Sequence, residues 1–284
     1  MISQQIVSSE LPERLRQIPS SPKHLFVLGA PLDEYKESAC LSVIGSRALS
    51  PYGKLAAQQL LPDVVRAGVT IISGLALGAD ALAHRITLDH SGRTIAVLPS
   101  SVNEVYPATN RQLAQEILQK NGTLVSEYPD GTDARRENFI ARNRLVSGLS
   151  HAILIIEAAE KSGTLHTANF ALEQGRDVMV VPGNITSPQS IGTNNLLKAG
   201  ATPVTSSTDI LRALGIEKTA TQQTLFANTP EEAILIKLLQ NGIHEGAQLL
   251  HRSELDPQTY SQTMTMLELQ GNIKPLGADN WSLG

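Results

Sequence analysis

Short apolar runs alternate with longer helical patterns between residues 41 and 214, and this alternation constrains the fold more than any other feature. Each run is rich in Val, Ile and Leu and ends near Gly, Pro or Ser. Strands that alternate with helices form βαβ units, and near-continuously apolar strands are covered on both faces. The sequence therefore predicts an α/β fold, an extended Rossmann-like, doubly wound and mainly parallel sheet. The predicted strands are 41–44, 69–72, 94–98, 123–125, 152–156, 177–181 and, more weakly, 203–205, and the predicted helices are 51–67, 78–90, 108–120, 137–148, 164–174 and 192–199.

Two less regular segments flank this Rossmann-like core, which we place at 41–214. The first forty residues are punctuated by prolines, and we interpret 1–40 as an N-terminal extension in which 25–29 is a possible edge strand. Residues 215–228 are polar with little periodicity, which predicts a linker. A small second domain is then expected at 229–284.

The second domain opens with a clear helix start. Thr229 is a suitable N-cap, Pro230 lies in the first turn, and Glu232 follows the cap by three residues. Two more helices and two short strands follow, an order that predicts a winged helix. Its third helix, 257–270, contains no Lys or Arg, whereas a duplex-reading helix normally offers cations. We therefore expect contact with a protein, either a partner or a second copy, ahead of contact with DNA.

The overall composition limits the chain's compartment and its way of meeting nucleic acid. A formal net charge of -4 and a pI of about 6.0 argue against non-specific coating of duplex DNA, but they leave room for a local basic pocket. Cys40 is the only cysteine, which fits a reducing cytoplasm. No stretch approaches the ~20 apolar residues of a bilayer span, and no signal peptide is evident. We expect a cytoplasmic protein without membrane contact.

Glycine- and hydroxyl-rich turns follow several of the predicted strands. Gly45, Ser46 and Arg47 follow the first strand, Gly74 follows the second, and the segment 161–164 precedes a helix. Glycine lets the backbone approach a ligand, and amides at a helix start bind anions. Because ligands of doubly wound sheets bind beyond the carboxyl ends of the strands, these turns together favour a phosphate-bearing ligand.

A cluster of arginines lies in the stretch 135–144. Four arginines surround Phe139 in an otherwise acidic chain. Arginines for phosphates beside an aromatic face for a base are typical of a single-strand site. The alternative is a solvated charged helix in which Phe139 fills the core, and for Phe139 alone both interpretations stay open.

Motifs for common enzyme chemistry are absent from the sequence. There is no Walker A sequence, no GxGxxG after the first strand, and no spacing of His and carboxylates typical of metal ligands. His84 has no Ser or Cys partner at a triad spacing. We therefore expect no catalytic residues, no metal and no cofactor.

Taken together, these blocks resemble the DprA/Smf family of DNA-processing proteins. The blocks include VIGSRALSPYG (43–53), SGLALGADALAH (73–84), SEYPDGTDARRENFIARNRLVSGLS (126–150) and EAAEKSGTLHTANFALEQGRDV (157–178). The resemblance covers about residues 20–214. It implies a dimeric, non-enzymatic protein that binds single-stranded DNA, protects incoming DNA and helps load a RecA-type recombinase during natural transformation and homologous recombination.

The resemblance also implies which residues bind DNA. Arg47 is expected to grip a phosphate and Phe139 to lie beside a base. An enzyme on a nucleotide, such as a phosphoribohydrolase, is the alternative, but the expected PGGxGTxxE motif is broken at Asn184 and its glutamate is missing. The expected DNA-binding residues are Gly45, Ser46, Arg47, Gly74, Arg135, Asn138, Phe139, Arg142, Asn143, Arg144, Lys161, Ser162, Gly163 and Thr164.

Overall fold

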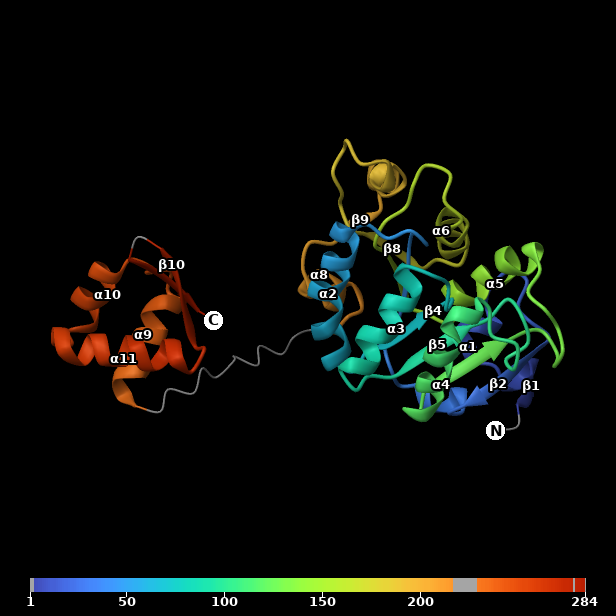
Figure 1. The fold of residues 1–284 in the computed structure, drawn as a ribbon, viewed down its shortest axis with the longest axis horizontal. Helices are drawn as coiled ribbons and strands as arrows, with labels where there is room; N and C mark the ends of the chain where they lie inside the picture. Colours follow the sequence, from blue (N-terminus) through green and yellow to red (C-terminus); the bar gives the residue numbers. More distant parts are fainter. Residues whose placement is uncertain (1–2, 217–228, 278, 284) are drawn as a thin grey trace. The chain divides into compact units, whose positions relative to one another are not determined.

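The chain divides into two compact units, Met1–Glu217 and Lys218–Gly284, in the computed structural model (Figure 1). The structure describes residues 3–216, 229–277 and 279–283. Most of the predicted linker, 217–228, lies outside the described residues.

The larger unit contains one sheet with the strand order β1-β2-β6-β5-β4-β3-β7-β8-β9. All neighbouring strands from β3 to β9 pair in parallel, whereas β1 and β2 pair antiparallel with their neighbours. The predicted mainly parallel α/β fold is thus confirmed. The strands are β1 (Gln4–Val7), β2 (His24–Gly29), β3 (Cys40–Ile44), β4 (Thr70–Ser73), β5 (Thr94–Val97), β6 (Thr123–Ser126), β7 (Ala152–Ile155), β8 (Asp177–Val180) and β9 (Thr202–Pro203).

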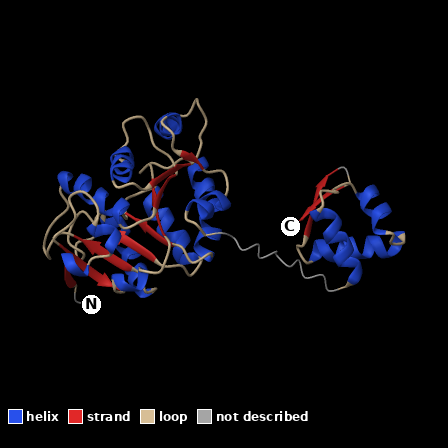
Figure 2. Cartoon of the chain, turned by 180° about the vertical axis from the view of Figure 1, so that it is seen from behind, coloured by secondary structure: helices blue, strands red, loops and turns tan. Residues whose placement is uncertain are grey.

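Helices cover both faces of this sheet, and Figure 2 shows the strands lying between them. Side chains alternate along each strand, so that Cys40 and Ile44 of β3 join one core while Leu41 and Val43 join another. One core includes α1, α5 and α6, a second includes α2, α3 and α8, and a third includes α4 and the end of α3. The helices are α1 (Glu13–Arg16), α2 (Pro51–Arg66), α3 (Ala79–Asp89), α4 (Arg111–Gln119), α5 (Arg136–Gly148), α6 (Thr164–Glu173), α7 (Ile191–Lys198) and α8 (Ser207–Ala213).

The first forty residues belong to the sheet and its core. Strand β1 pairs with β2, and β2 pairs with β6, so the segment extends the sheet at one edge. Leu15 and Ile18 are buried against the same core as α5 and α6. The prolines that favoured a separate N-terminal extension at 1–40 interrupt the segment without removing it from the sheet, and strand β1 begins with two polar glutamines that give no apolar signal.

The direction of the sheet reverses at β3. From β3 the chain moves outward through β4, β5 and β6, then returns to β7 on the other side of β3 and continues to β8 and β9. The carboxyl ends of β3 and β7 therefore flank a topological switch point, where doubly wound sheets bind ligands.

The smaller unit has three helices and a hairpin. They are α9 (Pro230–Gln240), α10 (Gly246–Ser253), α11 (Pro257–Leu269), β10 (Ile273–Gly277) and β11 (Asn280–Leu283). The Thr229 hydroxyl caps α9 by accepting a hydrogen bond from the Glu232 amide at 3.2 Å, as the sequence predicts. This order of elements is the expected one, and the winged-helix assignment stays a prediction. None of the described helices is long and apolar enough to cross a lipid bilayer.

Candidate nucleic-acid site

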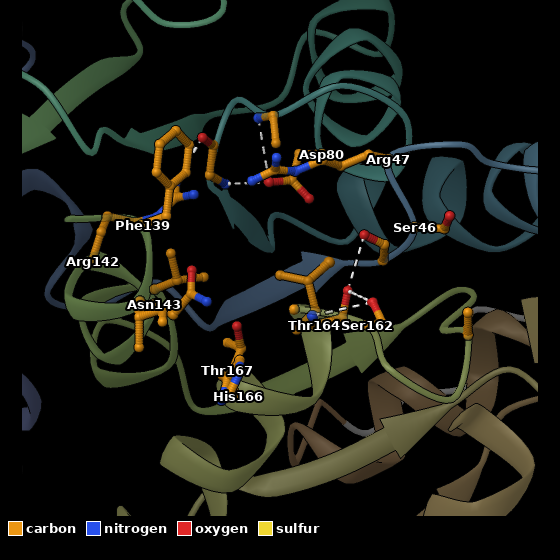
Figure 3. A pocket seen from close by; sticks show the side chains of 18 of the residues that line it. Ser46, Arg47, Asp80, Phe139, Arg142, Asn143, Ser162, Thr164, His166 and Thr167 are labelled. Atoms are coloured by element: carbon orange, nitrogen blue, oxygen red, sulfur yellow. Dashed lines mark hydrogen bonds between the residues drawn. The ribbon is translucent and has the colours of Figure 1, made fainter. Parts of the chain in front are cut away.

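A cavity of about 860 Å³ lies at the switch point of the sheet (Figure 3). Its walls come from the turns that follow β3, β4 and β7 and from one face of α5. Three helices begin at this cavity, because Asp80 at the start of α3, Arg136 at the start of α5 and Thr164 at the start of α6 all line it. Helix N-termini carry partial positive charge, so the position favours an anionic ligand.

The turn after β3 is clamped from two sides. The Ser46 amide donates to the Glu157 carbonyl at 2.8 Å, and the Ser46 carbonyl accepts from the Ala79 amide at 3.1 Å. Gly78 has a φ of +76°, and a Cβ atom there would lie 2.2 Å from the Ser46 carbonyl oxygen. A glycine is therefore required at Gly78 to bring the α3 turn against the Gly45–Arg47 turn.

Arg47 and Phe139 lie together at the cavity. The guanidinium carbon of Arg47 lies 5.1 Å from the centroid of the Phe139 ring, which is a cation–π distance. Tyr106 contacts the same ring edge-to-face with centroids 5.5 Å apart. Arg47 is exposed and Phe139 half-buried. A cation able to bind phosphate and an aromatic ring are thus presented side by side, a combination found in binding sites for single-stranded nucleic acid.

The turn before α6 forms the opposite wall. The Thr164 hydroxyl donates to the Gly45 carbonyl at 3.1 Å and so ties the turn after β7 to the turn after β3. The Ser162 hydroxyl donates to Thr164 Oγ1 at 3.0 Å, and it accepts from the Thr164 amide at 3.2 Å. Lys161 is exposed on the same wall. These groups surround the cavity with hydroxyls and a cation that can bind phosphate oxygens.

Arg142 forms the floor of the cavity and is only 4% exposed. Its Nη1 donates to the Gly74 carbonyl at 2.6 Å and also to the Val97 carbonyl. Burial lowers the pKa of Arg142 to about 10, the charge of Asp80 acts against that shift, and Arg47 adds to it. A Cβ atom at Gly74 would lie 2.1 Å from Nη1, so any larger residue there would displace this guanidinium from its hydrogen bonds. Arg142 thus braces the β4 turn, and its Nη1 hydrogen bonds are directed into the protein.

Asp80 organises the same turn from within. Its Oδ2 accepts from the Gly74 amide at 3.1 Å and from the Ala76 amide at 3.4 Å. Burial raises the pKa of Asp80 above its ordinary value, and the charge of Arg142 and the two amides oppose that rise. Asp80 lies in the first turn of α3, and its hydrogen bonds hold the loop that precedes this helix.

The chain also matches known proteins. The family of DNA recombination-mediator protein A matches residues 4–215. This chain belongs to that family. The resemblance to DprA/Smf proteins that the motifs indicate is thereby confirmed. The family is described by a role in recombination rather than by an enzymatic reaction.

Individual relatives agree with this assignment. Protein Smf of Escherichia coli is 45% identical over 174 residues, which is 61% of this chain and 46% of that protein. DNA processing protein DprA of Bacillus subtilis is 36% identical over 209 residues, covering 74% of this chain and 70% of that protein. The chain spans about half the length of the first Smf relatives that it matches, 46% and 52%.

Two solved structures of the family share the fold. DNA processing protein A from Streptococcus pneumoniae has a TM-score of 0.69 and 33% identity, over 74% of each chain. The protein from Helicobacter pylori, described for its single-stranded DNA binding mode, has a TM-score of 0.67 and 31% identity over 74% of this chain and 95% of that one.

Most of the residues expected from the motifs line the cavity, and three do not. Arg135 is exposed but outside the wall. Asn138 is buried, and its side-chain Nδ2 donates to the Pro99 carbonyl at 3.0 Å. Arg144 forms an ion pair with Glu127 at 2.7 Å. Those that line it are Gly45, Ser46, Arg47, Gly74, Phe139, Arg142, Asn143, Lys161, Ser162, Gly163 and Thr164.

The cavity is also lined by residues that lie outside the sequence motifs expected to bind DNA. Arg136 and Ile140 share the α5 face of Phe139, and His166 lies one turn into α6. Gln189 accepts a hydrogen bond from the Ser46 hydroxyl at 3.1 Å across a separation of 143 residues. No local pattern signals such a contact, although the i, i+3, i+4 spacing of 136, 139 and 140 indicates a shared face.

Metal chemistry has no support in the described part of the chain. No group of three or more His, Cys, Asp or Glu side chains is placed to hold a metal ion among the residues that the structure describes. His84 is buried, and its Nδ1 lies 2.7 Å from the Thr94 hydroxyl.

Proposed function

We propose that this protein binds single-stranded DNA in the cavity at the switch point. A phosphate would lie between the Gly45–Arg47 turn and the 161–164 turn and would contact the Arg47 side chain. A base would lie against the Phe139 ring. The observation that carries the proposal is the pairing of Arg47 with Phe139, in which the guanidinium carbon lies 5.1 Å from the ring centroid. The pair lines the cavity at which three helices begin. The single-strand binding described for the Helicobacter pylori relative, which is 31% identical, supports it.

The local charge supports the same ligand. Among the described residues that line the cavity, Arg47, Arg136, Arg142 and Lys161 are cations and Asp80 is the single carboxylate. Three of the cations, all except Arg142, are exposed to a ligand. Each phosphate contact on a single strand contributes about 0.7 to the slope of log affinity against log salt, so a slope of about -2 is expected.

We further propose a cellular role in recombination. By this proposal the chain acts in the cytoplasm as a homodimer, protects incoming single strands and helps load a RecA-type recombinase in natural transformation and homologous recombination. The smaller unit is proposed to contact a protein, because α11 carries no Lys or Arg. Sedimentation mass tests the dimer, and recombinase filament assembly on coated single strands tests the loading role.

The binding site itself is tested by a charge-matched pair of variants. Arg47→Ala should weaken oligo-dT binding at least about tenfold and lower the salt slope by about 0.7, because one phosphate contact is lost. Arg66→Ala is the control, since Arg66 is exposed and paired with Asp63 at the end of α2. Fluorescence anisotropy of labelled oligo-dT and a matching duplex across a salt series measures both. Equal affinity for the duplex, or equal effects of the two variants, would overturn the site.

A further inference from the structure

The loop between β8 and α7 presents an apolar side chain to solvent. Ile185 is 89% exposed, a larger exposed fraction than that of any other large apolar side chain among the described residues. A single exposed apolar residue is ordinary on a protein surface. What sets Ile185 apart is the way that its loop is held and where the loop leads.

Hydrogen bonds fix the backbone on both sides of Ile185. The Asn184 side-chain oxygen accepts from the Thr186 amide at 3.0 Å and from the Thr186 hydroxyl at 2.9 Å, and the Asn184 carbonyl accepts from the Ser187 amide at 3.0 Å. The Asn194 side chain bonds to both the amide and the carbonyl of Gly183, at 3.3 and 3.1 Å. The loop backbone at Ile185 therefore loses little conformational entropy when a ligand binds.

The same loop is continuous with the cavity. Gln189, four residues beyond Ile185, lines the cavity and accepts the hydrogen bond from the Ser46 hydroxyl. Before Ile185, the Pro182 carbonyl accepts a 2.6 Å hydrogen bond from the Tyr52 hydroxyl. Four residues span at most about 14 Å, so the backbone of Ile185 lies within about 14 Å of that of Gln189 in the cavity wall.

We propose that Ile185 contacts the single strand where it leaves the cavity, packing against the face of an unstacked base. The inference rests on the proposed function of the cavity. The loop from 182 to 191 contains no Asp or Glu to repel phosphates, and polar Asn184 and Thr186 flank the isoleucine. That composition lacks the contiguous apolar core of a protein interface, whereas a base offers an apolar face to one side chain.

The test compares long and short ligands. Ile185→Ser should weaken binding of oligo-dT of about 15 nucleotides by about tenfold, because an apolar contact of roughly half an isoleucine is lost. It should leave the affinity for a thymidine dinucleotide unchanged, because that ligand does not reach the loop. The salt slope should stay the same, since no cation is removed. Ile185→Phe should preserve or strengthen binding of the long ligand.

A matched control and two further readouts make the outcome decisive. Val7→Ser removes an exposed apolar side chain, 49% exposed, from β1 at the opposite edge of the sheet, and should change nothing. If Arg47→Ala weakens binding of both ligands while Ile185→Ser weakens binding of neither, the loop contact is refuted and the proposed DNA site in the cavity is supported. If Arg47→Ala has no effect, the proposed function itself fails. If Ile185→Ser instead lowers the sedimentation mass of the DNA-free protein, the loop is a protein contact and the inference is overturned.

Discussion

Replacing Arg142 by methionine tests whether this arginine has a structural role, as distinct from the DNA-binding role proposed for Arg47. The sequence groups Arg142 with Arg47 as a DNA ligand, but its Nη1 bonds to the carbonyls of Gly74 and Val97 beneath the cavity. Methionine keeps an unbranched stem of similar reach and removes the guanidinium. We expect Arg142→Met to act mainly on stability and Arg47→Ala mainly on binding.

The expected loss follows from the groups that are left behind. Two buried carbonyls lose a charged donor, and each such bond contributes about 1.5–3 kcal/mol. Buried Asp80 also loses the nearby positive charge that opposes the rise in its pKa. Burying the Arg142 charge is itself unfavourable, since burial lowers its pKa to about 10. Removing that charge therefore offsets part of the lost stability. We expect the free energy of unfolding of the larger unit to fall by about 2–4 kcal/mol.

The chain supplies its own internal control for the assay. Trp281, the only tryptophan, lies in β11 of the smaller unit. In urea, far-ultraviolet circular dichroism follows both units, whereas tryptophan fluorescence follows the smaller one. The fluorescence transition should stay in place in Arg142→Met, while the part of the dichroism transition that belongs to the larger unit moves to lower urea.

The binding readout decides between the two roles. Binding is measured without urea, at a temperature where Arg142→Met is folded. The slope of its log affinity against log salt should equal that of the parent protein, because no exposed phosphate contact is lost. Arg47→Ala should lower the slope by about 0.7 and leave both unfolding transitions unchanged. An Arg142→Met protein with parental stability and a reduced slope would refute this reasoning.

Two further variants test the packing beneath the site. Gly78→Ala places a Cβ atom 2.2 Å from the Ser46 carbonyl and should weaken oligo-dT binding at least about tenfold, whereas Gly68→Ala, with a similar φ of +83° and no atom within 4 Å, should leave binding unchanged in the same anisotropy assay. Burial lowers the pKa of His84 to about 3 from 6.5, so the folded protein resists a proton that the unfolded chain accepts. The stability that His84 contributes is therefore present above pH 6.5 and is lost as the pH falls toward 3, by at most about 1.4 kcal/mol per pH unit. Urea titrations between these pH values should show a smaller loss of unfolding free energy per pH unit in His84→Gln than in the parent protein. An equal pH slope in both proteins would contradict the assignment.

The buried strands were predictable because they are almost wholly apolar. Predicted 152–156 and 177–181 differ from β7 (Ala152–Ile155) and β8 (Asp177–Val180) by a single residue at one end. The edge strand β1 was missed because its glutamines are exposed and its partner lies some twenty residues away. Composition cannot reveal an antiparallel pairing of that kind.

The helix α5 shows what residue type alone leaves undetermined. Arg136, Phe139 and Asn143 recur at three- and four-residue spacing and line the cavity. Asn138 and Leu145 are seven residues apart and lie on a different face of the helix, where both are buried. The sequence motif had grouped Asn138 with the cavity residues. Helical periodicity therefore separates these faces, whereas a count of arginines does not.

The position of the cavity explains how an acidic chain can hold an anionic ligand. At physiological salt, charges more than about 8 Å apart are largely screened, so a net charge of -4 spread over the surface has little weight inside the cavity. There, exposed Arg47, Arg136 and Lys161 act at contact distance, together with the N-termini of three helices. The whole-chain charge therefore bears on whether the protein coats duplex DNA. It does not bear on whether one pocket grips a strand, which depends on where the few cations and helix ends converge.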